Sequence, residues 1–205
     1  MDIERILKND IIIMTGHRNE GNTMTLCNIM AQYLKDYTGS VWTFGVSKSI
    51  TSKLSEIRPV NLFWSIREME KIQNSLIIAD EAGDLLNVIN RKQHESMLKT
   101  LRAVAHQNNI IVLCSLPFDF KKVFAAQARC FLYKGMNIQE LINGSLIKET
   151  LMEYKGHELG AYRLNLAKEK VLCYDEKGFW TEKVNYIKEL DTKRDNKNMF
   201  TRRIK

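Results

Sequence analysis

Short apolar runs alternate with helical patterns along the first two thirds of this chain. Continuous runs at 10–15, 75–79 and 110–114 predict fully buried strands, and residues 40–46 and 130–133 read as two more. Helices are predicted near 23–37, 65–73, 91–107 and 119–127, after an amphipathic lead-in over 1–9. This alternation predicts an α/β fold with a mostly parallel sheet between helices.

The last third of the chain has a different pattern. Apolar and polar residues alternate over 149–155, 162–168 and 171–174, and residues 175–178 form a turn signal, so we expect antiparallel strands at the sheet edge. Few apolar residues follow residue 187, and basic residues outnumber acidic ones there. We therefore predict one domain over 1–187 (core 10–134, appended strands 149–184), and a basic, mobile tail over 188–205.

A glycine-containing loop joins the first predicted strand to the first long helix. Gly16, Gly21 and Thr23 match the P-loop (Walker A) pattern G-x-x-x-x-G-K-[ST], in which backbone N–H groups and a helix N-terminus bind phosphates. Asn22 stands where the pattern has lysine, and Arg18 is the nearest side chain that could replace its charge, with His17 a weaker candidate. A glycine-rich turn without a ligand is the alternative. The predicted nucleotide-binding residues are Gly16, His17, Arg18, Asn19, Glu20, Gly21, Asn22, Thr23 and Met24.

A second motif follows the strand predicted at 75–79. Four apolar residues precede Asp80 and Glu81, which is a Walker B pattern. Asp80 and the Thr23 hydroxyl would hold Mg²⁺, and Glu81 would orient and polarise an attacking water. Because parallel strands end at the same sheet edge, we expect the loop and the acidic pair to face each other across one cleft.

With residues 98–106 and the strand after them, these motifs resemble the P-loop ATPases of the HerA/FtsK superclass, which includes viral genome-packaging ATPases and Zot-like phage proteins. The resemblance covers about residues 10–134. It implies a RecA-like core, ATP hydrolysis with Mg²⁺, a ring of subunits (a hexamer or pentamer), movement of double-stranded DNA, and capsid or portal-like partners. It also implies Arg102 or Arg91 as an arginine finger acting on a neighbour's nucleotide. Ser115 stands where the family usually carries a polar sensor, often Gln.

Composition narrows the partners and the compartment. The chain has 205 residues, a 44% hydrophobic fraction and a net charge of +7, which suits one domain with a polyanionic partner such as nucleic acid or an anionic membrane face. The four cysteines form no C-x-x-C pair, so we expect reduced core thiols. No apolar run reaches the ~18 residues of a membrane span, and no signal peptide is visible. We expect a protein of the host cytoplasm or the virion.

Three functions fit these patterns. The leading hypothesis is an ATP-driven motor subunit that moves double-stranded DNA for a virus or mobile element. Asn22 motivates the alternative, a degenerate nucleotide-binding P-loop protein with a structural or assembly role. A small-molecule kinase shares the loop, but it usually lacks an Asp-Glu pair at this strand tip and needs an arginine-rich lid that the sequence does not reveal.

Overall fold

A computed structural model describes residues 1–86, 91–120, 122–137, 146–154, 163–164, 166–187 and 190. Within these residues, eight strands form one sheet in the order β10-β9-β6-β1-β5-β4-β2-β3, and β7 and β8 form a separate ladder. The elements are α1 (Ile3–Leu7), β1 (Ile11–Thr15), α2 (Asn22–Asp36), β2 (Ser40–Phe44), α3 (Lys48–Leu54), β3 (Val60–Leu62), α4 (Ile66–Met69), β4 (Ser75–Asp80), α5 (Ala82–Leu86), α6 (Arg91–His106), β5 (Ile110–Ser115), η1 (Pro117–Asp119), α7 (Lys122–Ala125), β6 (Cys130–Tyr133), β7 (Met136–Asn137), α8 (Leu146–Tyr154), β8 (Arg163–Leu164), β9 (Lys170–Asp175) and β10 (Gly178–Lys183).

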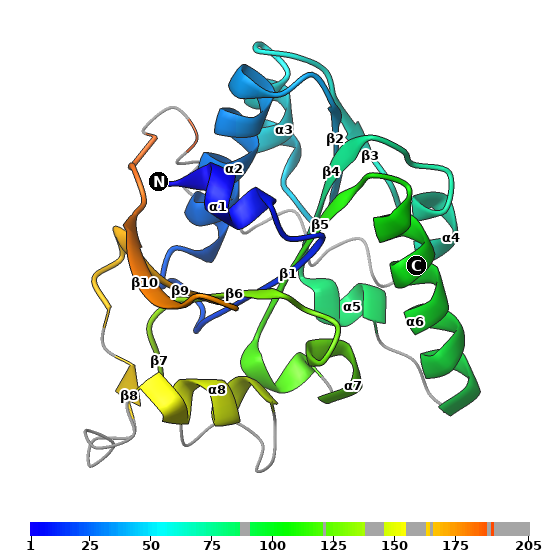
Figure 1. Ribbon diagram of the computed structural model, residues 1–205. Helices are drawn as coiled ribbons and strands as arrows, with labels where there is room; N and C mark the ends of the chain where they lie inside the picture. The colour runs from blue at the N-terminus through cyan, green and yellow to red at the C-terminus, as the bar shows by residue number, and fades with distance from the viewer. Residues whose placement is uncertain are drawn as a thin grey trace, which may run out of the picture.

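The sheet lies between two layers of helices (Figure 1). Strand β1 pairs in parallel with β5 and β6, and every one of its residues is buried. Successive side chains of a strand point to opposite faces, so Ile11 and Ile13 pack with α4–α8, whereas Ile12 and Met14 pack with α1–α3. A strand covered on both faces has no polar side, which is why residues 11–14 are continuously apolar.

The structure confirms most of the predicted core. The strands expected at 10–15, 75–79, 110–114 and 130–133 correspond to β1, β4, β5 and β6, and the long helices to α2 and α6. The helix expected over 65–73 extends only from Ile66 to Met69, and the one expected over 119–127 is the short α7, Lys122–Ala125, preceded by the 3-10 turn η1, Pro117–Asp119. Strand β3 was not predicted, because its three residues lie at the sheet edge, none is fully buried, and no apolar run marks them.

The C-terminal third is only partly as predicted. Strands β9 and β10 are antiparallel and joined at the expected turn. The strand predicted over 149–155 is wrong: residues 146–154 form α8, whose buried Ile147, Thr150 and Leu151 are spaced three and four residues apart and share one helix face. Of the strand predicted over 162–168, only Arg163–Leu164 is a strand among the described residues; it is β8, which pairs with β7 rather than with the main sheet, and residues 166–168 are not part of a strand. Apart from Leu190, the predicted tail over 188–205 lies outside the described residues.

The first helix is bound to the antiparallel edge of the sheet. The Arg5 guanidinium donates from Nε and Nη2 to the two carboxylate oxygens of Asp175, at 2.9 and 2.7 Å, and lies 3.6 Å from the centre of the Trp180 ring. This pair lowers the pKa of Asp175 below its usual value. The contact therefore joins the start of the chain to β9 and β10. No helix among the described residues is long and apolar enough to cross a membrane.

Candidate functional site

The loop after β1 is folded into a compact turn. Asn19 and Gly21 have positive φ angles, 67° and 89°. The Asn22 amide nitrogen donates to the carbonyl oxygens of Gly16 and His17, at 3.2 and 3.4 Å, and the Glu20 N–H donates to the His17 carbonyl at 3.3 Å. The side chain that replaces the expected lysine therefore holds the shape of the loop from within.

The loop leads into α2, whose N-terminus has no side-chain cap. Gly21 is the N-cap of α2 and has no side chain to accept from the first turn, which also contains no acidic residue. The first helical hydrogen bond runs from the Thr25 N–H to the Gly21 carbonyl, at 3.0 Å. The N–H groups of Asn22, Thr23 and Met24 precede this bond and point out of the helix end. The N-terminus of this 15-residue helix is therefore suited to bind an anion.

The acidic tip of β4 lies against this helix end. Strands β1 and β4 are both hydrogen-bonded to β5, and the Thr23 hydroxyl donates to Asp80 Oδ2 at 3.2 Å. The loop and the Asp-Glu pair, predicted separately from sequence, are therefore in direct contact at one edge of the sheet.

The environment of Asp80 disfavours the charged form of its carboxylate. Burial, and to a smaller extent the charge of Glu81, raises its pKa to about 6, while the Thr23 hydrogen bond acts in the opposite direction. A cation on the oxygens of Asp80 and Thr23 would relieve this cost. Among the described residues, no group of three or more His, Cys, Asp or Glu side chains could hold a metal ion. The oxygens at this contact come from one carboxylate and one hydroxyl. This arrangement fits Mg²⁺, which is usually held by one or two carboxylates together with phosphate oxygens.

Glu81 is held in a strained backbone conformation. Its φ of 63° is uncommon for a residue other than glycine, and the residue is exposed directly after Asp80. The turn is fixed by the Asp84 N–H, which donates to the Glu81 carbonyl at 2.9 Å. Gly45, directly after β2, packs closely against the same turn. A Cβ atom there would lie 1.9 Å from the Asp80 carbonyl oxygen, so this close approach requires glycine. Strain of this kind concentrates at functional positions.

Ser115, the predicted sensor, lies at the end of β5 and connects it to the end of β1, to α5 and to η1. Its carbonyl accepts from the Thr15 hydroxyl at 3.0 Å, and its own hydroxyl accepts from the Gly83 N–H at 3.2 Å and is hydrogen-bonded to the Asp119 carboxylate. The Ser115 hydroxyl is therefore engaged by protein groups, and it holds the segment just after Glu81.

The predicted basic residues lie apart from this contact. Arg18 is exposed on the loop. Arg102 is also exposed, and its Nε donates to Gln127 Oε1 at 2.7 Å, one turn before the end of α6 that leads to the amino end of β5. Arg102 therefore lies towards the amino ends of the strands, whereas the loop of the same chain lies at their carboxyl ends, so Arg102 cannot reach that loop. The side chain of Arg91 lies outside the described residues.

Two residues at this edge were missed by sequence reasoning. Cys114 is opposite Asp80 in the register of β5 and β4, and the interaction with its thiol lowers the pKa of that carboxylate slightly, against the larger effect of burial. Burial raises the pKa of Cys114 well above its usual value, so the thiol is neutral. Lys134 follows β6 directly and is completely buried beside the loop. The sequence signal for Lys134 was a charged residue directly after an apolar strand. That signal does not place Lys134 beside the loop, because its position depends on the pairing of β6 with β1.

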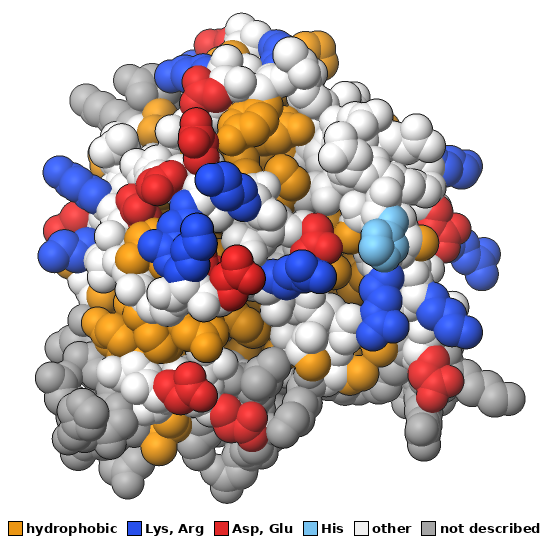
Figure 2. All heavy atoms as spheres, viewed as in Figure 1, with side chains coloured by type: hydrophobic (Ala, Val, Ile, Leu, Met, Phe, Trp, Pro, Cys, Tyr) orange, Lys and Arg blue, Asp and Glu red, His pale blue; other side chains and the backbone are white. Residues whose placement is uncertain are grey.

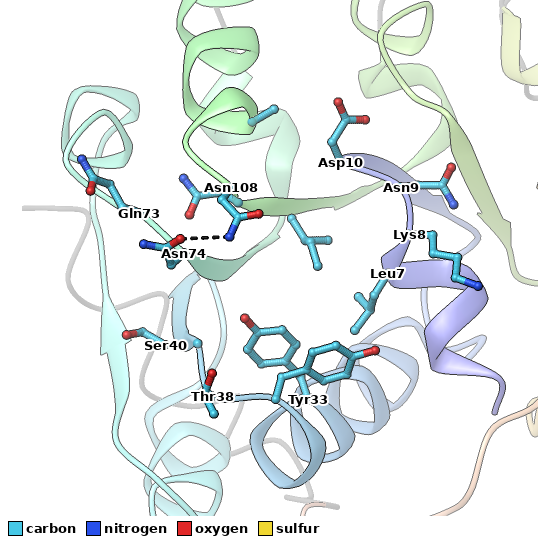
Figure 3. A pocket seen from close by; sticks show the side chains of 15 residues that line it. Leu7, Lys8, Asn9, Asp10, Tyr33, Thr38, Ser40, Gln73, Asn74 and Asn108 are labelled. Atoms are coloured by element: carbon cyan, nitrogen blue, oxygen red, sulfur yellow. Dashed lines mark hydrogen bonds between the residues drawn. The ribbon is translucent and has the colours of Figure 1, made fainter.

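A hollow lies at the opposite end of the sheet (Figure 3), where Asp10, Ser40, Asn74 and Ile110 mark the amino ends of four strands. Its volume is about 700 Å³. Neutral polar groups predominate around it, including the Asn74 and Asn108 amides, which are hydrogen-bonded to each other at 2.9 Å. Ligands of open parallel sheets bind at the carboxyl ends of the strands, and the loop after β1 and the tip of β4 lie at that end, not beside this hollow.

Comparisons with known proteins bear on the fold. No family model matches the sequence, and no curated protein does. Among solved structures, the genome packaging NTPase B204 of Sulfolobus turreted icosahedral virus 2, in complex with AMPPCP, is 14% identical with a TM-score of 0.60, covering 87% of this chain and 99% of that one. The DNA-packaging ATPase B204 of Sulfolobus turreted icosahedral virus is 16% identical with a TM-score of 0.60, covering 86% and 98%. A structure described as an ATPase is 12% identical with a TM-score of 0.60, covering 89% and 81%.

At these identities the likeness concerns the fold alone. The eight-stranded sheet of the described residues, mostly parallel with an antiparallel C-terminal edge, matches these neighbours over nearly their whole length. The fold class predicted from the sequence is therefore confirmed: the chain has a RecA-like P-loop NTPase fold.

Proposed function

We propose that this protein is an ATPase subunit that moves double-stranded DNA, for packaging the genome of a virus or mobile element. The observation that carries the proposal is the 3.2 Å contact between Thr23 and Asp80, which joins a phosphate-binding loop to an acidic strand tip. A 15-residue helix without a side-chain cap begins beside a carboxylate whose pKa is raised to about 6, and a bound phosphate together with a cation would be stabilised by these two features.

Each residue has a chemical task in this proposal. The N–H groups of Asn22, Thr23 and Met24 would bind phosphate oxygens, and Thr23 and Asp80 would hold Mg²⁺. Bound Mg²⁺ would neutralise charge on the phosphates. Glu81, exposed directly after Asp80, would orient the attacking water and accept its proton. Ser115 would keep the turn after Glu81 in place through the Gly83 N–H.

The DNA and the neighbouring subunit are inferred from charge and from exposure. The chain carries a net charge of +7, which favours a polyanion. On the face seen in Figure 2, basic and acidic side chains are intermingled, so we do not assign the DNA to that face. Arg102 is exposed and directed away from its own loop, which suits a role on the nucleotide of a neighbour in a ring. The packaging function named for B204 supports the same assignment by fold only.

One observation favours a second function. Asn22 cannot provide the charge of a P-loop lysine, so a protein that binds nucleotide without turning it over, in a structural or assembly role, would carry the same loop. In that case, Asn22→Lys would improve nucleotide affinity by an order of magnitude or more, since a charge-assisted hydrogen bond contributes about 1.5–3 kcal/mol.

Steady-state ATP turnover, measured with and without double-stranded DNA, tests the leading proposal. We expect Mg²⁺-dependent turnover that DNA stimulates, and its loss in Glu81→Gln, which keeps the shape of the side chain but removes the base. Glu176→Gln, an exposed change in the β9–β10 turn, is the matched control. No turnover under either condition, together with no difference between the two variants, would contradict the enzyme assignment.

A further inference from the structure

Lys134 is a buried lysine beside the phosphate-binding loop. It follows β6 directly and has no exposed surface. Its backbone N–H donates to the Thr15 carbonyl at 2.9 Å, and the His17 N–H donates to the Gly135 carbonyl at 3.0 Å, so this segment is hydrogen-bonded along the start of the loop. The position of Lys134 is therefore fixed by the pairing of β6 with β1.

The side chain of Lys134 extends along the loop from its first glycine to its second. A Cβ atom on Gly16 would lie 2.5 Å from Cβ of Lys134, and one on Gly21 would lie 3.5 Å from both Cε and Nζ of Lys134. The ammonium group is thus beside the residue that precedes Asn22. A side chain on Gly16 would clash with Lys134, so the glycine at this position makes room for it.

The ammonium group is incompletely compensated in this position. It donates to the carbonyl oxygens of Lys168 and Lys170, both at 2.6 Å, which leaves its third N–H without an assigned partner among the described residues. No ion pair within the described part of the chain joins it to a carboxylate. Burial lowers its pKa to about 8, although the charges of Glu20 and Glu169 act in the other direction. A buried, unpaired cation is costly, and a phosphate would offset that cost.

We propose that Lys134, from the strand beside the loop, supplies the phosphate-binding ammonium that Asn22 cannot, and that its ligand is a nucleoside di- or triphosphate. Rotation about the terminal bonds of the side chain would redirect Nζ from the two carbonyls towards the loop. The two tasks of a P-loop lysine are then divided: Asn22 holds the loop carbonyls, and Lys134 carries the charge. This inference rests on the proposed nucleotide site.

The test compares nucleotide affinities in the full-length protein. Lys134→Met keeps an unbranched side chain out to Cε and removes the ammonium group with its charge. Lys170→Met is the matched control, because Lys170 is exposed and provides only its backbone carbonyl, which the substitution retains. Dissociation constants for ATP, ADP and AMP are measured with Mg²⁺ by displacement of a fluorescent nucleotide, after a thermal melt of each variant.

We expect Lys134→Met to weaken ATP and ADP by roughly 10- to 100-fold and AMP by less than about threefold, since AMP lacks the outer phosphates. Lys170→Met should change none of them by more than about twofold. Equal loss for all three nucleotides would show that Lys134 only supports the fold and would overturn the proposal. Unchanged ATP affinity would overturn it as well.

A second variant does not depend on the stability of Lys134→Met. If Lys134 already occupies the ammonium position, Asn22→Lys should improve ATP affinity by less than about threefold, whereas a gain of tenfold or more would overturn the inference. The double variant Asn22→Lys with Lys134→Met should recover most of the affinity lost in Lys134→Met. If the unmodified protein binds none of the nucleotides, the proposed function fails too. If it binds ATP and Lys134→Met binds equally well, only the role of Lys134 fails.

Discussion

Replacing Asp80 by asparagine separates stability from function at the candidate site. The substitution keeps the size of the side chain and an oxygen that can accept from the Thr23 hydroxyl, which now donates at 3.2 Å. It removes only the charge, whose cost is visible in a pKa raised from 3.8 to about 6. We therefore expect Asp80→Asn to stabilise the metal-free protein at neutral pH while it removes Mg²⁺-dependent nucleotide binding.

The size of the effect follows from linkage. A shift of about two pKa units at roughly 1.4 kcal/mol each gives an upper value of about 3 kcal/mol. Because the folded pKa of this acid is above its unfolded value, the folded state binds the extra proton. The unmodified protein therefore loses stability relative to Asp80→Asn as pH rises from about 4 through 6, and the difference is constant above about pH 7. At 2–4 °C per kcal/mol for a chain of this size, this upper value corresponds to a rise of about 6–12 °C in the melting temperature.

The assay is thermal unfolding in EDTA at several pH values from 4 to 8, with Glu176→Gln as the control for loss of an exposed carboxylate. The difference in melting temperature should be near zero at pH 4 and largest at pH 7–8. A lower melting temperature for Asp80→Asn at pH 8, or a difference that does not depend on pH, would refute the argument that the Asp80 charge is uncompensated.

Two further predictions concern the residues around the site and the sheet edge. Gly45→Ala places a Cβ 1.9 Å from the Asp80 carbonyl oxygen at a φ of 75°, so we expect a loss of at least about 2 kcal/mol by urea unfolding and weaker nucleotide binding; unchanged stability would contradict the packing described for this turn. Arg5→Met breaks the bidentate pair with Asp175 and should cost about 2 kcal/mol at pH 7. Because Arg5 lowers the pKa of Asp175, this stabilisation is present above about pH 4 and lost below it. Unfolding curves of the two proteins should therefore converge towards pH 2, and a constant gap would argue against the ion pair.

The parts of the site that are local in sequence could be predicted, and the parts that depend on strand order could not. The loop and the Asp80-Glu81 pair each follow an apolar strand directly, so each motif is complete within about ten residues. The parallel arrangement then placed both at one edge of the sheet. Lys134 reaches the loop only because Tyr133 is opposite Thr15 in the register of β6 and β1, and no local pattern states that pairing.

The C-terminal errors have a related cause. In residues 149–155 the alternation of polar and apolar residues suggested a strand, but the same residues present Thr150 and Leu151 with Ile147 on one face of α8. Contacts with the sheet decide between the two patterns, and the hydrophobic cluster under α6–α8 is built from distant segments. Strand β3 was missed for the opposite reason: an edge strand of three residues has too little burial to leave a pattern.

A structure determined with a non-hydrolysable ATP analogue and Mg²⁺ tests the central claim most directly. We predict that the phosphates lie over residues 16–24 at the start of α2, with the metal on the oxygens of Thr23 and Asp80. A nucleotide bound in the hollow at the amino ends of the strands (Figure 3), or a loop that stays empty at saturating nucleotide, would contradict the account.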